Sequence, residues 1–501
     1  MFDLSSFSDN KLRYWTAVLT TILSLLGLLV LLSSSIGKEA DMHRSLAPAF
    51  TQLVAWILGI SAMFTLGSCG SIARVRRLLI WPLTIFTIVL LIWAGWFSEA
   101  INNVHRWISF RSISFQPSEL GKLALIFLWA EYLSRHSSKV VKLSDFSSRF
   151  RKRKSEHAET KLSLVNFLLD LLNGIVIFFK LFWVPLIVTV IFVGLFERGS
   201  DLGTTVLMSA VIFCMVFMVG FSRKVLLTIM TCAFLIVLYT VLSLDAVNIS
   251  QLHPEEMQNH YRKERMIGWR HTDYDPKGVN YQIRNALAAI SSGGLFGVGI
   301  PHSRSRYNFI PEMHCDFIYS IYSEEMGLLG VLGLFCLFFA FGVFGLTIAN
   351  RSKNEFLSLA AFGITTQIIC QLLYNISVVT GLMPNKGLPL PFFSHGGSSL
   401  MMSFISVGLL LNIIHHSESA EKHIEEKQVK KKGPTVAVTS DSSYEKHESI
   451  SGDDSGDAWE ASAAPVENTS SYNALPKPII SCSIMSSEDL RMLRRSGKAG
   501  K

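Results

Sequence analysis

The sequence predicts an all-α, polytopic membrane protein with about ten transmembrane helices. Half of the 501 residues are hydrophobic and only 17% are charged, a balance too apolar for a soluble domain. Apolar runs of about 20 residues, the length that crosses roughly 30 Å of hydrocarbon, recur through residues 1–416, which we therefore assign to one membrane domain. The runs lie at 14–35, 49–68, 78–97, 118–134, 181–196, 202–220, 225–244, 317–348, 356–380 and 393–414.

Short basic loops set the predicted orientation, because lysine and arginine accumulate on the cytoplasmic side of a membrane. Such loops occur at 74–77, 135–163, 223–224 and 351–353, so both termini are predicted to be cytoplasmic. The segment 245–316 then becomes the largest extracytoplasmic loop. The start of the chain reads as an uncleaved first span rather than a signal peptide. A further run at 164–179 is interrupted by polar residues and predicts an interfacial or re-entrant helix that feeds the fifth span.

Residues 417–501 contain few large apolar side chains and predict a disordered cytoplasmic tail. Its segment 486–495 could instead form a short amphipathic docking helix. The net charge of +8 does not indicate nucleic-acid binding, because the basic run at 149–154 lies beside the membrane, where anionic headgroups attract it. The seven cysteines show no metal-ligand spacing and are interpreted as apolar packing residues.

Function is sought where ionisable groups lie at membrane depth or at its outer rim, because burial of such groups is costly unless they pair or act. One candidate loop, 102–119, carries Arg106, Trp107, Gln116 and Glu119. Trp107 could instead be an interfacial anchor, and Glu119 could simply complement the positive end of a helix. Asp201 opens the next candidate helix, where capping explains an aspartate as well as catalysis does.

Three titratable residues, Glu312, His314 and Asp316, immediately precede the apolar run at 317–348 and suggest proton transfer or cation binding. The glycine-rich stretch 291–299 before them could approach a ligand closely. Glu324 and Glu325 follow within the run. Because adjacent helical residues point to different faces, at least one of these carboxylates is expected to face the bundle interior.

The stretch 386–399 is the most informative polar feature. Lys386 offers a flexible cation suited to phosphate, and the segment Gly396–Ser399, which includes Ser398, offers donors at a helix start. The small residues at 396–399 could instead allow close helix packing in lipid. Packing does not account for Lys386 in the same way.

Together these motifs resemble the shape, elongation, division and sporulation (SEDS) family. The resemblance covers residues of about 10–415 in the family's order. Its motifs are Arg106–Ile108, Gln116–Leu120, Asp201–Thr204, Ser292–Gly297, Pro311–Phe317, Glu324–Gly327, and Gly387–Phe392 with Gly396–Ser399. Lys386 in the Asn-Lys-Gly motif favours the division-type members over the elongation type.

The resemblance implies a peptidoglycan glycosyltransferase of the cytoplasmic (inner) membrane that polymerises lipid II at its outer face during cell division. It implies that Asp316 is the catalytic base. Lys386 and Arg106 are then candidates for stabilising the pyrophosphate, and Trp107 and Gln116 for shaping the cavity. The remaining substrate-binding candidates are Glu119, Asp201, Glu312, His314 and Ser398.

The implied partners are a class B penicillin-binding transpeptidase and other division proteins. No cofactor is assigned, and a requirement for a divalent cation is left open. One competing function is a lipid II flippase, although no pair of matching broken helices occurs in the sequence. An elongation-type or sporulation-type polymerase and a noncatalytic scaffold for a transpeptidase also compete with the division-type enzyme.

Overall fold

The computed structural model describes residues 7–35, 42–70, 72–98, 105–110, 113–154, 162–220, 261–270, 280–300, 315–384 and 387–431, together with Ser303 and a few positions in 227–239. Eleven helices and one short hairpin are assigned within these ranges. The helices are α1 (Asp9–Ser35), α2 (Met42–Ser68), α3 (Ile72–Phe97), α4 (Pro117–Lys154), α5 (Leu162–Arg198), α6 (Leu202–Met218), α9 (Tyr261–Arg270), α10 (Tyr281–Gly293), α11 (Ile318–Arg351), α12 (Glu355–Val379) and α13 (Gly397–Lys431). Strands β1 (Ile108–Phe110) and β2 (Ile113–Phe115) form the hairpin.

Seven of the described helices are long and apolar enough to cross a membrane, which confirms a helical, multi-pass membrane protein. They lie in α1, α2, α3, α5, α11, α12 and α13. Helix α6 is apolar but has only 17 residues. The apolar part of α4 contains the charged residues Glu119, Lys122 and Glu131, which lower its hydropathy. The expected run at 225–244 lies mostly outside the described residues, so the count of ten remains a prediction.

The helix expected at 164–179 is present and leads into the following span. Helix α5 runs from Leu162 to Arg198, and two helices meet within it at Phe182, whose backbone is not helical (φ −114°, ψ 17°). The part long and apolar enough to cross a membrane is Phe179–Arg198, so the preceding residues feed this span, and their interfacial or re-entrant position stays a prediction. Helix α4 likewise extends through Lys154 into the predicted basic loop, and α13 extends to Lys431, into the region predicted to be disordered.

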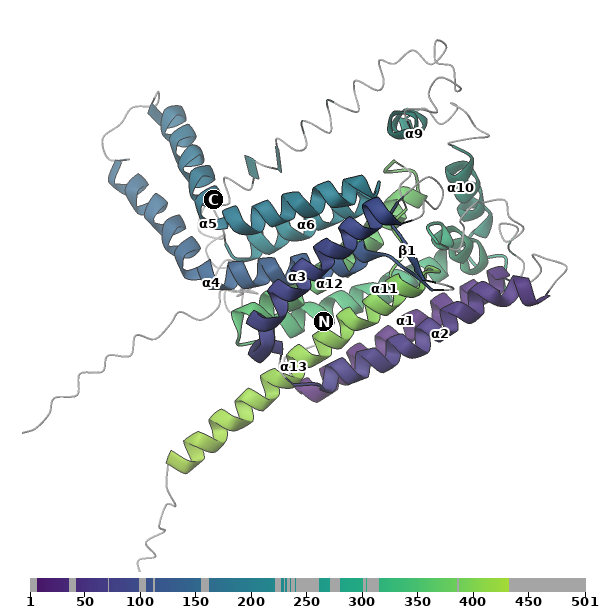
Figure 1. Ribbon diagram of the computed structural model, residues 1–501, viewed down its shortest axis with the longest axis horizontal. Coiled ribbons are helices and arrows are strands. Elements are labelled where there is room, and N and C mark those ends of the chain that lie inside the picture. The colour runs from purple at the N-terminus through teal and green to yellow at the C-terminus, as the bar shows by residue number, and fades with distance from the viewer. Residues whose placement is uncertain are drawn as a thin grey trace, which may run out of the picture. The chain divides into compact units, whose positions relative to one another are not determined.

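Helices α11 and α12 form the centre of the bundle. Helix α11 packs on α12, α1 and α10, while α12 also packs on α4 and α6. Helices α2 and α13 approach closely at glycines: Gly59 faces the Phe404 ring, and Gly408 faces the backbone of Met63. Most of these helices run along a common direction (Figure 1).

Hydrogen bonds between helix ends define two ends of the bundle. At the first, which we call the site end, α4, α6, α11 and α13 begin and α12 ends, as contacts of Gln116 with Asp201 and of Asn375 with Asp316 require. At the other, the opposite end, α1 begins where α11 ends, because Arg351 bonds Asp9. Helices therefore begin at one end of the bundle and end at the other in alternating directions.

The glycine-rich stretch packs against a break in α11. Gly327 adopts φ +64°, which interrupts the helix, and the backbone N–H groups of Val298 and Gly299 donate to the carbonyls of Glu324 and Glu325 at 2.9 and 3.0 Å. A side chain at Gly297 would collide with the Glu325 carbonyl. Gly293 and Gly297 thus allow close approach of two backbone segments. Approach of this stretch to a ligand stays a prediction.

Candidate active site

Asp201 joins the start of α6 to the start of α4. Its Oδ1 accepts a hydrogen bond from the Thr204 backbone N–H at 3.3 Å, which confirms the predicted helix cap. Its Oδ2 accepts bonds from the Ser118 hydroxyl at 2.8 Å and the Gln116 amide at 3.1 Å. The carboxylate is 4% exposed, and its donors come from both helices. Asp201 is thus a buried organising group.

The β1–β2 hairpin brings Trp107 and Gln116 to neighbouring positions. Ile108 pairs with Phe115 in the antiparallel register, so the residues that flank the pair lie at the same end of the hairpin. The Arg106 guanidinium lies 5.9 Å from the centre of the Trp107 ring. Its buried Nε has no hydrogen-bond partner among the described residues. The hairpin was not predicted, although both strands repeat Ile-Ser-Phe with the alternation typical of a strand.

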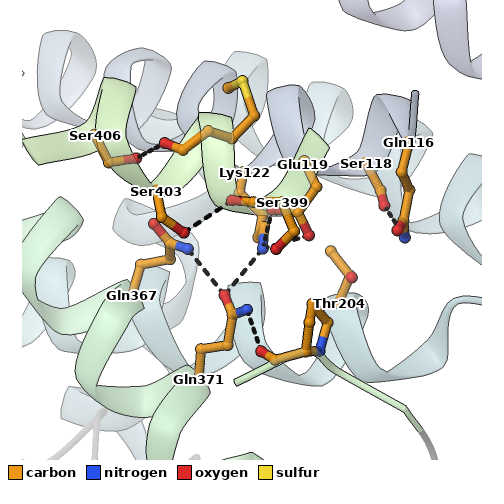
Figure 2. A network of polar contacts seen from close by, with 12 residues as sticks. Gln116, Ser118, Glu119, Lys122, Thr204, Gln367, Gln371, Ser399, Ser403 and Ser406 are labelled. Carbon is orange, nitrogen blue, oxygen red and sulfur yellow. Dashed lines mark hydrogen bonds and ion pairs between the residues drawn. The ribbon is translucent and has the colours of Figure 1, made fainter. Parts of the chain in front are cut away.

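Glu119 is paired with Lys122 inside the bundle. The lysine Nζ lies 2.8 Å from Glu119 Oε2, and the two side chains are only 2% and 3% exposed. Lys122 also donates to Gln371 Oε1 of α12 at 2.9 Å. Figure 2 shows Gln371 between Lys122 and Gln367, with its amide nitrogen directed to a backbone carbonyl. That carbonyl belongs to Pro389, at 2.7 Å.

Asp316 lies where the segment 387–390 returns to α12. The Asn375 amide donates to the Asp316 carbonyl at 2.9 Å and to the Leu388 carbonyl at 2.7 Å. Gly387 lies so close to the Asp316 carboxylate that a Cβ on this glycine would collide with it. Asp316 itself is partly exposed, unlike Asp201 and Glu119. Among the candidate carboxylates that the structure describes, it is therefore the one that solvent reaches.

The segment 390–396 contains an unusual backbone conformation at Phe392. Phe392 has φ +67°, a conformation that costs a bulky residue about 1–3 kcal/mol. Its ring is buried against those of Phe338, Phe341 and Phe404, which lie on α11 and α13. Ser394 accepts a hydrogen bond from the Leu390 N–H at 2.6 Å. Aromatic packing and local hydrogen bonds thus fix the segment that follows Gly387.

The structure brings several predicted residues together and leaves others apart. Gln116 and Asp201 are bonded directly, while Glu119 and Asp316 are both linked to the segment 387–390 through α12. Ser398 is buried at the start of α13, and its hydroxyl has no partner among the described residues. Glu312, His314 and Lys386 lie outside the described residues.

Glu324 and Glu325 are both buried, as the argument from adjacent helical positions anticipated for at least one of them. Glu324 accepts a hydrogen bond from the Ser303 hydroxyl at 2.6 Å, and Glu325 accepts one from Ser33 of α1. These carboxylates therefore bind α1 and Ser303, four residues after the glycine-rich stretch, to α11. Within the described ranges, no group of three His, Cys, Asp or Glu side chains forms a metal-binding cluster.

Sequence reasoning missed Lys122, Gln371 and Asn375. A lysine within an apolar run signals a buried partner, and Lys122 stands three residues after Glu119. Gln367, Gln371 and Asn375 recur every four residues on α12 and therefore share one face. This polar stripe in a span predicts an interior polar contact, but the sequence does not show which element it meets.

The geometry agrees with what the comparison with protein families finds. The family model described as "Cell cycle protein", FTSW_RODA_SPOVE, matches residues 14–419, which include every described site residue above. The chain belongs to this family. The match stops near the point where the predicted tail begins.

Curated relatives of the family cover most of the chain. A "Probable peptidoglycan glycosyltransferase FtsW" from Hydrogenovibrio crunogenus is 30% identical over 80% of this chain and 90% of its own length. Another of the same name, from Halothiobacillus neapolitanus, is 27% identical over 87% of this chain and 94% of its own. Stage V sporulation protein E from Bacillus subtilis is 29% identical over 80% and 96%. The chain is thus similar to division-type and sporulation-type members of the family.

A solved structure shares the fold. A chain in "Structural coordination of polymerization and crosslinking by a peptidoglycan synthase complex" matches with a TM-score of 0.57 and 24% identity, over 81% of this chain and 98% of that one. The helical membrane architecture is therefore the family's fold.

Proposed function

We propose that this protein is a peptidoglycan glycosyltransferase that polymerises lipid II during cell division. Lipid II is an undecaprenyl-pyrophosphate-linked disaccharide peptide. Curated relatives that match over most of their length carry the name peptidoglycan glycosyltransferase FtsW, which supports the reaction class. The observation that carries the site assignment is the contrast among three carboxylates at the site end. Asp201 and Glu119 are buried with their donors, whereas Asp316 is partly exposed.

Asp316 acts as the general base. It accepts the proton of the acceptor sugar's 4-hydroxyl while that oxygen attacks the donor's anomeric carbon. The bond from the anomeric carbon to the pyrophosphate oxygen breaks, and undecaprenyl pyrophosphate leaves with the electron pair. Attack from the face opposite the leaving group converts an α linkage to a β linkage.

The leaving pyrophosphate requires cations, because negative charge develops there as the bond breaks. Lys386 and Arg106 supply them in this proposal. Gly387, the residue that follows Lys386 in the sequence, lies against the Asp316 carboxylate. The Nε of Arg106, which lacks a partner among the described residues, is a donor suited to an anionic oxygen.

The remaining candidates form the walls of the substrate site. Trp107 and Gln116 lie at one end of the hairpin, next to the Asp201 cap. Ser398 offers a buried hydroxyl at the start of α13. Glu119 and Asp201 act by holding α4, α6 and α12 in register, and Glu312 and His314 complete the rim before Asp316.

The site end faces the outside of the cytoplasmic membrane in this proposal, and the basic opposite end faces the cytoplasm, with ten spans in total. The large loop 245–316 is then extracytoplasmic, beside Asp316. A class B penicillin-binding transpeptidase of the division type is the proposed partner, because the solved fold relative belongs to a synthase complex that couples polymerisation with crosslinking. Other division proteins at the septum would regulate the pair.

The test is polymerisation of labelled lipid II by the purified full-length protein with its transpeptidase, in the presence of moenomycin. We expect moenomycin-resistant glycan strands from the wild type and a loss of at least about 100-fold in Asp316→Ala, since removal of a general base costs ~10²–10⁴ in rate. Asp201→Asn is the comparison at a buried carboxylate of the same end. Strands from Asp316→Ala at the wild-type rate would refute the base assignment. Lipid II transfer across liposome bilayers without strands would establish the flippase instead.

A further inference from the structure

The base-bearing residue is held from another helix. Asp316 immediately precedes α11, and Phe317 at the helix start provides no side-chain cap. Asn375, in the last turns of α12, donates through its one amide nitrogen to the carbonyls of both Asp316 and Leu388. Asn375 is 2% exposed, so solvent does not compete for these bonds. The backbone on either side of the Asp316–Gly387 contact is thus tied to the same side chain.

The two segments that Asn375 joins lie outside regular structure. Residues 315–317 and 387–390 are not helical, so regular intrahelical hydrogen bonds do not fix them. One turn earlier on α12, Gln371 donates to the Pro389 carbonyl at 2.7 Å and accepts from the buried Lys122. The amides of α12 therefore connect the interior ion pair with the segment 387–390 and, through Asn375, with Asp316.

Resting on the proposed function, we propose that Asn375 is a positioning residue that sets the Asp316 carboxylate in register with the backbone at Gly387. The base and the cation act on opposite ends of the bond rearrangement: one takes the acceptor's proton and the other stabilises the leaving pyrophosphate. Their separation must match the substrate. Loss of the shared amide leaves both groups present but releases the two backbones from each other.

The chain offers a matched control at the opposite end. Asn412 on α13 is 1% exposed, and its amide nitrogen donates to the carbonyls of Leu66 at 2.9 Å and Cys69 at 3.0 Å. It makes the same kind of two-carbonyl contact as Asn375, equally buried, but remote from Asp316 in the fold. Substitution of either asparagine removes equivalent hydrogen bonds, so a difference in catalysis separates positioning from stability.

The experiment compares Asn375→Leu with Asn412→Leu in the full-length protein, in lipid nanodiscs with its transpeptidase. Leucine retains the approximate volume and removes the amide. Initial rates are measured across lipid II concentrations, and the melting temperature is recorded for each variant. Asn375→Ser, whose hydroxyl is too short to reach both carbonyls, is the second variant in case the leucine variant does not fold.

We expect Asn375→Leu to lower kcat about 100-fold, the effect of a misplacement of about 1 Å. KM is expected to change by less than about threefold, because the contacts that bind lipid II in the ground state are retained. Asn412→Leu should lower the melting temperature comparably and leave kcat within about threefold of the wild type.

Three outcomes overturn the inference. A folded Asn375 variant with wild-type kcat refutes it while wild-type polymerisation upholds the proposed function. Equal losses of kcat and melting temperature in the Asn375 and Asn412 variants assign Asn375 a structural role only. Wild-type protein that forms no strands under conditions in which it translocates lipid II refutes the proposed function and this inference together.

Discussion

The two ends of the bundle differ in how far their ion-paired side chains are exposed. At the site end the Glu119–Lys122 pair is 2–3% exposed and is enclosed by α4 and α12. At the opposite end Arg135 pairs with Glu131 but is 47% exposed, and Arg351 pairs with Asp9 at 23% exposure. Burial of an ion pair in a low-dielectric interior costs several kcal/mol per ion before pairing offsets it. The site end therefore has an ion pair in which both partners are buried, whereas at the opposite end solvent or headgroups can reach the arginine of each pair, although Glu131 is itself only 6% exposed.

The two buried asparagines show the same difference in backbone terms. Asn412 donates to the carbonyl of Leu66, in the last turn of α2, and to that of Cys69, just beyond the helix, and so adds a donor where helix-end carbonyls have few intrahelical partners. Asn375 instead bridges two segments outside helices. The opposite end thus uses amides to complete helices, and the site end uses them to fix irregular backbone. Irregular backbone fixed by polar side chains is what a catalytic site needs.

The largest effect is expected from a substitution at Gly387, in the irregular backbone of the site end. In Gly387→Ala the new Cβ would collide with the Asp316 carboxylate, which must turn away. We expect polymerisation to fall by about 100-fold or more, with little change in melting temperature. The measurement is the rate of glycan-strand formation from labelled lipid II.

Gly396→Ala is the control for that substitution. Gly396 lies in the same connection between α12 and α13, but a Cβ there meets only Ser399 Cβ at 3.7 Å, an ordinary contact. Its rate should stay within about threefold of the wild type. Equal rates in both alanine variants would mean that the Asp316 carboxylate is not held where the structure places it.

The next largest effect is expected when a substitution breaks the buried Glu119–Lys122 pair. Lys122→Met leaves Glu119 without its cation and leaves Gln371 Oε1 with the Gln367 amide as its one donor among the described residues. Loss of one partner of a buried ion pair destabilises a protein by about 3–5 kcal/mol, and the measurement is unfolding in detergent. The double variant Glu119→Gln/Lys122→Met should recover most of that loss, because no buried charge remains.

Arg135→Met is the matched substitution at the opposite end. Because the Arg135 side chain is 47% exposed while that of Glu131 is 6% exposed, solvent screens this pair from the arginine side, and its loss should cost less than loss of the Glu119–Lys122 pair. If Lys122→Met were as mild as Arg135→Met, the contrast between the two ends would be refuted. If the double variant were no better than Lys122→Met, the lysine would contribute by packing rather than by charge.

The helical membrane class and the family could be read from the sequence because both depend on local signals. Apolar runs and the order of motifs can be recognised without knowing which residues are in contact. Asp201 was likewise recognisable as a helix cap from its position alone. The interior partners could not be read in this way. The contacts of Asn375 with Asp316 and Leu388 join residues 59 and 13 positions apart, so they depend on how α11, α12 and the segment 387–390 pack.

The glycine-rich stretch and the run at 164–179 show what the sequence leaves open. The glycines of 291–299 suggested close approach to a ligand, and in the structure Gly297 lies against the α11 backbone at Glu325. The run at 164–179 was expected to feed the fifth span, and α5 is broken at Phe182, where that run meets the span. A glycine or a polar position records a local constraint, and only the packed structure identifies what imposes it.

The smallest expected effect tests whether the opposite end is independent of the site. Arg351 Nη1 lies 2.6 Å from Asp9 Oδ1 and donates to the Phe7 carbonyl, also at 2.6 Å. Because the pair is partly exposed and therefore screened, Arg351→Ala should cost about 1 kcal/mol or less in unfolding free energy. Polymerisation should remain at the wild-type rate, since α11 reaches Asp316 only at its far end. A loss of more than about tenfold, or ~1.4 kcal/mol in the barrier, in a protein with unchanged stability would contradict this independence. It would mean that α11 transmits the anchoring of α1 to the base, and that the break at Gly327 does not separate the two ends.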